Sequence, residues 1–188
     1  ALTKYGQMLE PMVSSDEFSM LTTGHSATVG AVVKTVLRVL RTFKTSLSRQ
    51  KIAFLGLGSI GRASLLSLLS VEEHPQKIIL CDLKGTINTL KNIAEELRNK
   101  LGNKGEIQFS LSDDAAHEEI YNANIIVCAV SSVEVIKVHK MKKGTVLIDD
   151  SFPHCFNESE ALVRMQNKQD VLILGGGLLS IPFVKRTI

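Results

Sequence analysis

Residues 56–61, with the sequence GLGSIG, have the spacing in this chain that points most directly to chemistry. The segment follows a short apolar run and precedes a leucine-rich helical pattern, an arrangement typical of a dinucleotide-binding turn. In such a turn Gly56 permits the sharp exit from the strand, Gly58 lets the backbone approach a pyrophosphate, and Gly61 lets the helix pack closely. Backbone N–H groups at the start of the helix would face the phosphates. We therefore predict cofactor contacts from Gly56, Gly58, Ser59, Ile60 and Gly61.

An acidic residue follows at the distance expected for contact with an adenosine ribose. Asp82 ends the second apolar run, 21 residues after Gly61, whereas dinucleotide-binding units place this residue about 20 positions on. A carboxylate there accepts hydrogen bonds from the ribose hydroxyls and repels a 2′-phosphate, which favours NAD as the cofactor. Lys84 leaves NADP open, because a nearby cation could neutralise that phosphate. A plain turn role for Asp82 is the alternative.

Three further segments end apolar runs and are expected at the same edge of a sheet. Ala129, Val130 and Ser131 follow the fourth run, where open α/β sheets bind ligands, and we include them in the predicted cofactor site. The acidic pair at 149–150 follows the fifth run and could exchange protons, although a helix N-cap or a turn is the stronger alternative. The glycines at 175–177 predict backbone lying very near a neighbouring strand or the nicotinamide.

His25 is the titratable side chain outside the predicted sheet that is best placed for acid–base chemistry. It lies where a loop turns into a helix, from which an imidazole can reach a cleft and transfer a proton near neutral pH. A capping or structural role is the alternative. We predict His25 as a catalytic residue and Thr23 as a substrate contact. Cys155 could be a nucleophile, whereas apolar surroundings favour inert thiols at Cys81 and Cys128.

The composition excludes several classes of protein. The chain has 188 residues, of which 44% are hydrophobic and 22% charged, as in globular domains and unlike disordered chains or coiled coils. A net charge of +3 is too small to indicate a nucleic-acid partner. Three widely spaced cysteines without a ligand pattern predict no metal site and a reducing, cytoplasmic compartment. No uncharged stretch reaches the length of a membrane span.

Apolar periodicity predicts the elements that must position these residues. An amphipathic pattern runs from Thr22 to near Lys44, with Thr22 or Thr23 as the cap. Six strand-length apolar runs then alternate with helical patterns, and several are continuous, as expected when helices cover both faces of a sheet. The predicted strands are 51–55, 77–81, 106–110, 124–129, 145–148 and 170–174, and the other predicted helices are 2–9, 59–70, 86–101, 113–121, 133–138 and 158–167.

These patterns predict an α/β fold, a Rossmann-like doubly wound parallel sheet of about six strands preceded by a helical segment. Residues 1–48 are expected to be a helical segment leading into the sheet, a fragment of a substrate-side region. Residues 49–188 are expected to form an NAD(P)-binding Rossmann domain. Because the chain starts with alanine and lacks a signal-peptide pattern, we expect a processed or excised fragment.

Several segments resemble one family in their order along nearly the whole chain. Segment 21–28, with the sequence LTTGHSAT, the glycine turn, and segments 124–127, 146–150 and 174–177 are similar to the cyanobacterial long-chain acyl-carrier-protein reductases and related predicted amino acid dehydrogenases. The resemblance implies NAD(P)H-dependent reduction of an acyl thioester to an aldehyde through a cysteine thioester.

The chain departs from that family at two positions. Pro182 stands where the reductases carry the nucleophilic cysteine, and Asp82 stands where their pattern is basic and suits NADP. The family's amino-terminal domain and carboxyl-terminal extension have no counterpart in this sequence.

We predict an NAD(P)-dependent oxidoreductase domain that transfers hydride to or from a carbonyl, acyl or imine carbon. The alternatives are a shikimate-dehydrogenase-like or glutamyl-tRNA-reductase-like dehydrogenase domain and a non-catalytic NAD(H)-binding regulatory module, because a fold of this kind does not by itself select a function. The expected partners are a small-molecule or acyl substrate and either a second copy of the chain or the rest of a larger polypeptide.

Overall fold

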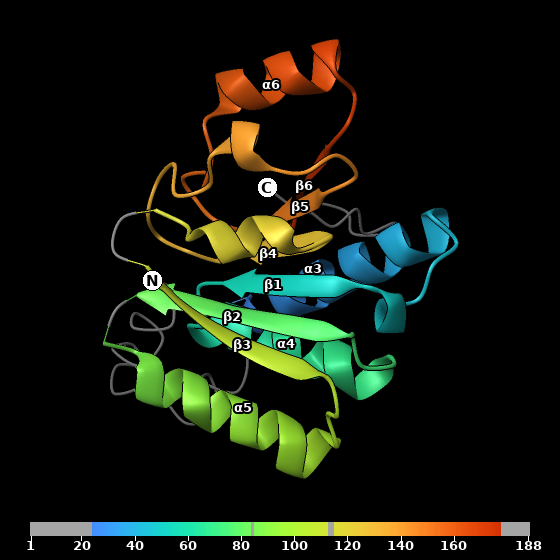
Figure 1. The fold of residues 1–188 in the computed structure, drawn as a ribbon, viewed down its shortest axis with the longest axis vertical. Coiled ribbons are helices and arrows are strands. Elements are labelled where there is room, and N and C mark those ends of the chain that lie inside the picture. Colours follow the sequence, from blue (N-terminus) through green and yellow to red (C-terminus); the bar gives the residue numbers. More distant parts are fainter. Residues whose placement is uncertain (1–23, 84, 113–114, 178–188) are drawn as a thin grey trace, which may run out of the picture.

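The computed structural model describes residues 24–83, 85–112 and 115–177, and Figure 1 shows them as a twisted sheet with helices on both sides. The strands are β1 (Lys51–Leu55), β2 (Lys77–Leu83), β3 (Glu106–Ser112), β4 (Ile125–Cys128), β5 (Val146–Asp149) and β6 (Leu172–Gly175). They form a 6-stranded sheet in the order β3-β2-β1-β4-β5-β6, with parallel neighbours throughout. This is the order of dinucleotide-binding α/β folds, and the predicted Rossmann-like sheet is confirmed.

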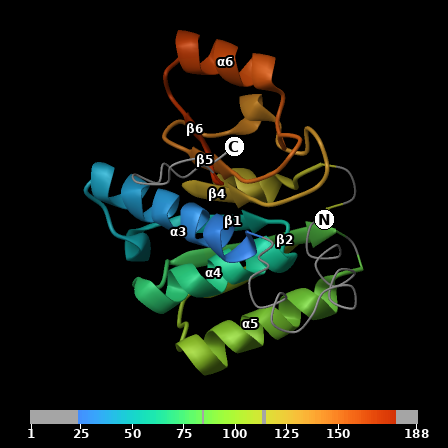
Figure 2. The same ribbon diagram turned by 180° about the vertical axis from the view of Figure 1, so that it is seen from behind.

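Helical elements cover both faces of the sheet. One face carries α3 (His25–Thr42), α4 (Ser59–Val71) and α5 (Ile87–Leu101), which lie side by side in Figure 2. The other face carries η3 (Glu118–Asn122), η4 (Val138–Lys140) and α6 (Glu158–Asn167), and the short turn η2 (Leu47–Arg49) joins α3 to β1. None of the helices in the described residues is both long and apolar enough to cross a membrane.

The core is divided between the two faces by the alternation of side chains along each strand. In β1, Ile52 and Phe54 pack into the cluster under α3, α4 and α5. Ala53 and Leu55 pack into the cluster on the opposite face, with η3, η4 and α6. Because both faces are buried, a strand of this sheet needs apolar residues at successive positions. This explains the continuous apolar runs in the sequence.

The long amphipathic helix that was predicted before the sheet is present as α3. Val32 and Val36 are buried on its inner face, so α3 shares the core of the sheet. Its N-cap residue is Gly24, at φ 73°, so the prediction that Thr22 or Thr23 occupies this position is wrong. Thr23 and the predicted helix at 2–9 lie outside the described residues.

Two predicted α-helices are replaced by shorter structure. Of the segment 113–121, the described part holds the 3-10 turn η3, which starts at Glu118. The segment 133–138 is irregular: Glu134 adopts φ 51°, and Ile136 forms a bridge to Phe156. Strands β2 and β3 extend two residues beyond the prediction, because Asp82 and Leu83 still pair with the end of β3.

The packing predicts which leucines carry stability. Leu68 in α4 is 1% exposed, and Leu68→Ala should lower the free energy of unfolding by about 2–5 kcal/mol through lost burial and the cavity left behind. Leu162 in α6 is 57% exposed, so Leu162→Ala should stay within about 0.5 kcal/mol. Urea unfolding followed by circular dichroism measures both variants. Equal losses would contradict this description of the core.

Candidate functional site

The glycine turn lies between the carboxyl ends of β1 and β4, where the order of the strands reverses. Gly56 has φ 84°, and a Cβ there would stand 2.5 Å from the carbonyl oxygen of Ala129. A Cβ at Gly61 would stand 1.9 Å from the carbonyl oxygen of Gly56. Both glycines are therefore required by packing within the protein. At Gly58 an added Cβ would meet nothing within 4 Å, so this position faces open space.

The first turn of α4 begins at this open position. Gly58 is the N-cap residue and makes no side-chain cap, and the structure places Ser59, Ile60 and Gly61 as the first three residues of the helix. The N–H groups of a first helical turn lack partners within the helix, and the helix dipole adds positive potential. The arrangement suits an anion that approaches over Gly58.

Asp82 lies beside the glycine turn, as the spacing predicts. Its Oδ2 accepts a hydrogen bond of 2.9 Å from the backbone N–H of Leu57. The bond joins the turn after β1 to the end of β2 and fixes the orientation of the carboxylate at the edge of the sheet. Lys84, which left NADP open, lies outside the described residues.

A pocket of about 240 Å³ brings together six of the predicted cofactor residues, whereas Ser59, Ile60 and Gly61 are not in its lining. Gly56, Gly58 and Asp82 line it together with the segment 129–132 after β4. Pockets that hold drug-sized ligands measure about 300–1,000 Å³. The volume of this pocket is therefore enough for part of a dinucleotide. Ser112 also lines it. Ser112 was not among the predicted site residues, because the third strand was predicted to end two residues earlier.

A second polar group lies on the same edge, at the end of β5. Asp150 is half-buried, and its backbone N–H donates to the carbonyl of Cys128 over 2.8 Å. A Cβ at Gly177 would stand 2.5 Å from Oδ1 of Asp150, so the glycines after β6 are explained by close approach to the neighbouring strand. Burial and then the charge of Asp149 raise the pKa of Asp150 to about 6, and the charge of His25 opposes this rise.

The adjacent carboxylate organises a loop on the opposite face. Asp149 is 3% exposed, and its carboxylate accepts hydrogen bonds from the backbone N–H groups of Ser151 (3.0 Å) and Cys155 (3.3 Å). Nδ1 of His154 lies 2.9 Å from Oδ2. The prediction of a turn role therefore describes Asp149 well, whereas Asp150 faces the side of α3.

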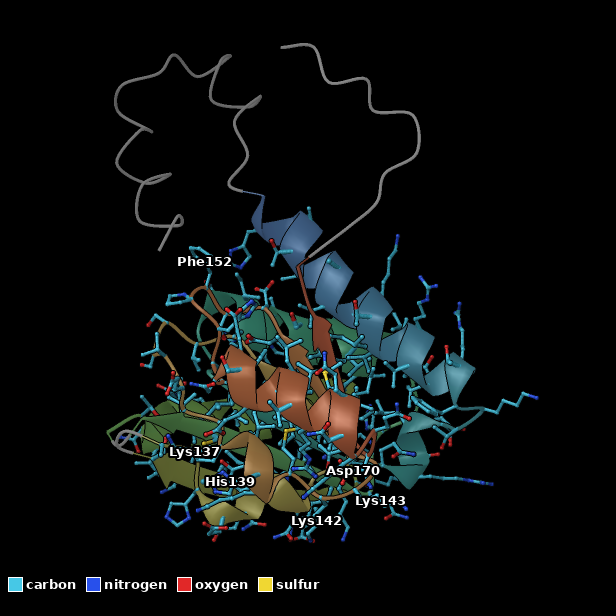
Figure 3. The ribbon with its side chains drawn as sticks, turned by 90° about the horizontal axis from the view of Figure 1, so that it is seen from above. Lys137, His139, Lys142, Lys143, Phe152 and Asp170 are labelled. Carbon is cyan, nitrogen blue, oxygen red and sulfur yellow. The ribbon has the colours of Figure 1, made fainter. Side chains whose placement is uncertain are left out.

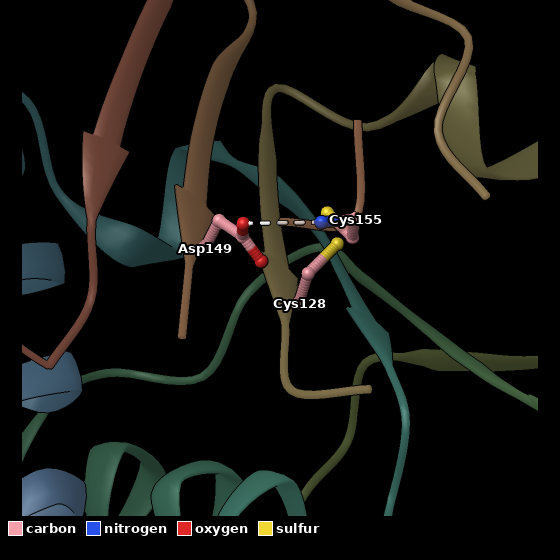
Figure 4. Close-up of side chains that lie close together, drawn as sticks. All are labelled: Cys128, Asp149 and Cys155. Carbon is pink, nitrogen blue, oxygen red and sulfur yellow. Dashed lines mark hydrogen bonds between the residues drawn. The ribbon is translucent and has the colours of Figure 1, made fainter. Parts of the chain in front are cut away.

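Cys128, Asp149 and Cys155 bring one ligand atom each to within 4.8 Å of one another, as Figure 4 shows. All three side chains are buried. Hydrogen bonding to Cys128 and burial raise the pKa of the Cys155 thiol, and the carboxylate is already satisfied by the three donors of the loop. The buried side chains of this cluster therefore lie at the base of the loop at 151–155, which the carboxylate of Asp149 holds in place.

The basic side chains of the segment 137–143 lie away from this edge. In Figure 3, Phe152, which follows Asp150 and is 93% exposed, lies on the opposite side of the view from Lys142 and Lys143. His139 is exposed and lies near these lysines. The basic segment 137–143 is therefore separate from the candidate site.

Comparisons with known proteins show what this fold is similar to. No protein-family model matches the chain, and no curated protein matches it. Among solved structures, L-tryptophan dehydrogenase from Nostoc punctiforme is 16% identical over 93% of this chain and 53% of its own, with a TM-score of 0.56. The 5-ketofructose reductase of Gluconobacter sp. strain CHM43 is 19% identical over 78% of this chain and 51% of its own, with a TM-score of 0.55.

A shikimate dehydrogenase from Aquifex aeolicus is also similar, with 20% identity over 78% of this chain and 49% of its own and a TM-score of 0.50. The similar solved proteins are mainly dehydrogenases and reductases, and at these identities the likeness shows the fold. The chain spans between 37% and 53% of the length of such proteins. L-tryptophan dehydrogenase and shikimate dehydrogenase thus share a fold with this chain, as expected for the Rossmann domain of a dehydrogenase.

The thiols of the described residues should be unreactive in the folded protein. Burial raises the pKa of Cys81 to about 11, so about one molecule in a thousand carries that thiolate at pH 8. Iodoacetamide should modify the native chain at least tenfold more slowly than the chain in urea. A long-chain acyl thioester with NADH should give no acylated protein by mass spectrometry. An adduct on Cys155 of the folded chain would contradict this and restore that residue as a nucleophile.

Proposed function

We propose that this chain is the cofactor-binding domain of an NAD(P)-dependent oxidoreductase that transfers hydride to or from a carbonyl, acyl or imine carbon. The observation that carries the proposal is the difference among the three glycines of the turn. Gly56 and Gly61 are closed by the protein's own backbone, whereas Gly58 faces open space at the start of α4. A glycine that no internal contact requires is explained by a ligand that approaches its backbone.

The chain's own residues divide the work of binding. The first turn of α4 would hold the pyrophosphate with its N–H groups. Asp82 would accept hydrogen bonds from the adenosine ribose, in the orientation fixed by Leu57. Ala129, Val130 and Ser131 would lie under the dinucleotide where it crosses from β1 to β4. A bound nicotinamide would supply or accept the hydride.

The described cysteines favour a direct transfer to a carbonyl or imine over an acyl-enzyme route. Covalent acyl transfer requires an accessible, activated thiolate. Cys81, Cys128 and Cys155 are free thiols, and all three are buried. The position that corresponds to the nucleophile of the acyl-carrier-protein reductases is Pro182, outside the described residues. We therefore propose a reaction like that of the dehydrogenases in that group, without an acyl-enzyme intermediate.

We further propose how the domain is joined to the parts that bind the substrate. Residues 1–48 would lead from a substrate-side region into the Rossmann domain at 49–188, with a small-molecule substrate between the two parts. A second copy of the chain or the rest of a larger polypeptide would complete the site, because ligand sites of this fold often lie between domains. Three free thiols support a reducing, cytoplasmic compartment, and the small net charge supports a role without nucleic acid.

The glycine turn provides a matched pair of variants that tests the proposal. Gly58→Val should leave the thermal unfolding temperature near that of the wild type and weaken NADH binding at least tenfold, about 1.4 kcal/mol, by blocking the pyrophosphate. Gly61→Ala should instead destabilise the fold by about 1–3 kcal/mol, because its Cβ would overlap the backbone of Gly56. Calorimetry measures binding, and thermal unfolding measures stability. A Gly58→Val chain that binds NADH like the wild type would remove the basis of the proposal.

The position of Asp82 predicts a preference for NADH over NADPH. The preference should amount to roughly 1.5–3 kcal/mol, the scale of hydrogen bonds to charged groups. Asp82→Asn keeps an oxygen that can accept from Leu57 and removes the charge, so it should abolish most of the preference while the turn stays in place. Calorimetric titration of the wild type and of Asp82→Asn with both cofactors measures this preference. Tighter binding of NADPH by the wild type would instead point to Lys84 as the partner of the phosphate.

A further inference from the structure

The sheet separates two half-buried carboxylates along one edge. Asp82 belongs to β2, and Asp150 follows β5. The order β2-β1-β4-β5 puts three strand spacings between them, about 14 Å. A dinucleotide held at β2 and crossing between β1 and β4 extends toward β5. Asp150 therefore lies at the end of the edge that the nicotinamide would occupy.

Asp150 has a neighbour on each element packed against it. On β4 its backbone N–H bonds to the carbonyl of Cys128. Beyond β6, Gly176 and Gly177 approach it so closely that a Cβ at Gly177 would overlap its carboxylate. From α3, His25 is the charged group near enough to act on it, and on its own strand the charged neighbour is Asp149.

Asp150 is also distinct from its neighbour in what its carboxylate does. The carboxylate of Asp149 is engaged with the loop at 151–155 on the opposite face. Asp150 points to the side of α3, and the backbone after β6 carries no side chain at Gly176 or Gly177 that would cover it. A carboxylate that is half-buried, within electrostatic reach of an imidazole and at the cofactor edge can accept and return a proton near neutral pH.

We propose that Asp150, with His25 as its partner on α3, exchanges a proton with the substrate at the nicotinamide end of the site. The substrate class that fits is a small alcohol or amine, or the corresponding carbonyl or imine in the reverse direction. This inference rests on the proposed function, because the hydride acceptor is NAD⁺.

The step balances in the oxidative direction. A bound NAD⁺ would accept a hydride, so the C–H bond of the reacting carbon would break and its electron pair would leave with the hydrogen. The O–H or N–H bond of the substrate breaks, its proton passes to the carboxylate of Asp150, and its electrons form the C=O or C=N bond. The substrate is oxidised by two electrons and NAD⁺ is reduced by two. A pKa near 6 lets Asp150 hold or release this proton near neutrality.

The decisive difference between the two cofactor forms is the charge of the nicotinamide ring. The ring of NAD⁺ is cationic and would lower the pKa of an adjacent carboxyl group, whereas the ring of NADH is neutral. By linkage, binding of NAD⁺ near pH 6 should release a proton from Asp150, and the affinity for NAD⁺ should rise as the pH increases through 6. Binding of NADH should show neither effect.

Calorimetry in buffers of different ionisation enthalpy counts the protons released on binding. With the wild type near pH 6 we expect a fractional proton release with NAD⁺ and none with NADH, and at least a threefold gain in NAD⁺ affinity between pH 5 and pH 7.5. Asp150→Asn should abolish the release and the gain and still bind NADH. Glu95→Gln, which alters an exposed carboxylate on α5, should behave like the wild type.

His25→Gln keeps Asp150 and tests the partnership without altering the carboxylate. Because the charge of His25 opposes the rise in the pKa of Asp150, this variant should move the maximum of proton release to higher pH. Equal proton release by the wild type and Asp150→Asn, with both cofactors bound, would overturn this inference and leave the proposed function standing. A chain that binds neither NAD⁺ nor NADH would overturn the proposed function itself.

Discussion

The close approach of backbone at the junction of β1 and β4 is the constraint on which the rest of the structure depends. The carbonyl of Gly56 lies where a side chain at Gly61 would stand, and the carbonyl of Ala129 lies where one at Gly56 would stand. These contacts let α4 begin directly at the end of β1, at the point where the strand order reverses. The N-terminus of the helix therefore faces an open edge instead of a covered face, which is the requirement for an anion site.

The end of β5 shows how the alternation of side chains separates structural from chemical roles. Successive residues of a strand point to opposite faces. Asp149 is nearly fully buried, a position that costs several kcal/mol unless donors satisfy the carboxylate, and the loop at 151–155 supplies them. Asp150, one residue on, is directed to the side of α3 and keeps a raised pKa. Asp149 thus holds the loop at 151–155 in place, and Asp150 lies at the carboxyl edge of the sheet.

Sequence patterns predicted the elements whose apolar runs are long, and they failed where tertiary contacts decide. The bounds predicted at 51–55 and 158–167 match β1 and α6, because Asn157 caps α6 and a buried run defines β1. The helix predicted at 133–138 is wrong, since a run this short does not distinguish helix from irregular backbone. In the site, the glycine turn and Asp82 carry a local spacing. The electrostatic interaction of His25 with Asp150 joins residues far apart in the chain, and no local pattern encodes it.

The length of α3 explains why a residue at its start can reach the edge of the sheet. The short turn η2 joins the end of α3 to the start of β1. The helix therefore begins toward the carboxyl edge of the sheet and ends at the amino edge. Its 18 residues span about 27 Å, whereas the five residues of β1 span about 17 Å. The helix is therefore roughly 10 Å longer than the strand, long enough to span it from one edge of the sheet to the other. His25, its first residue, therefore begins the helix on the side of the carboxyl ends of the strands, where its charge acts on the pKa of Asp150.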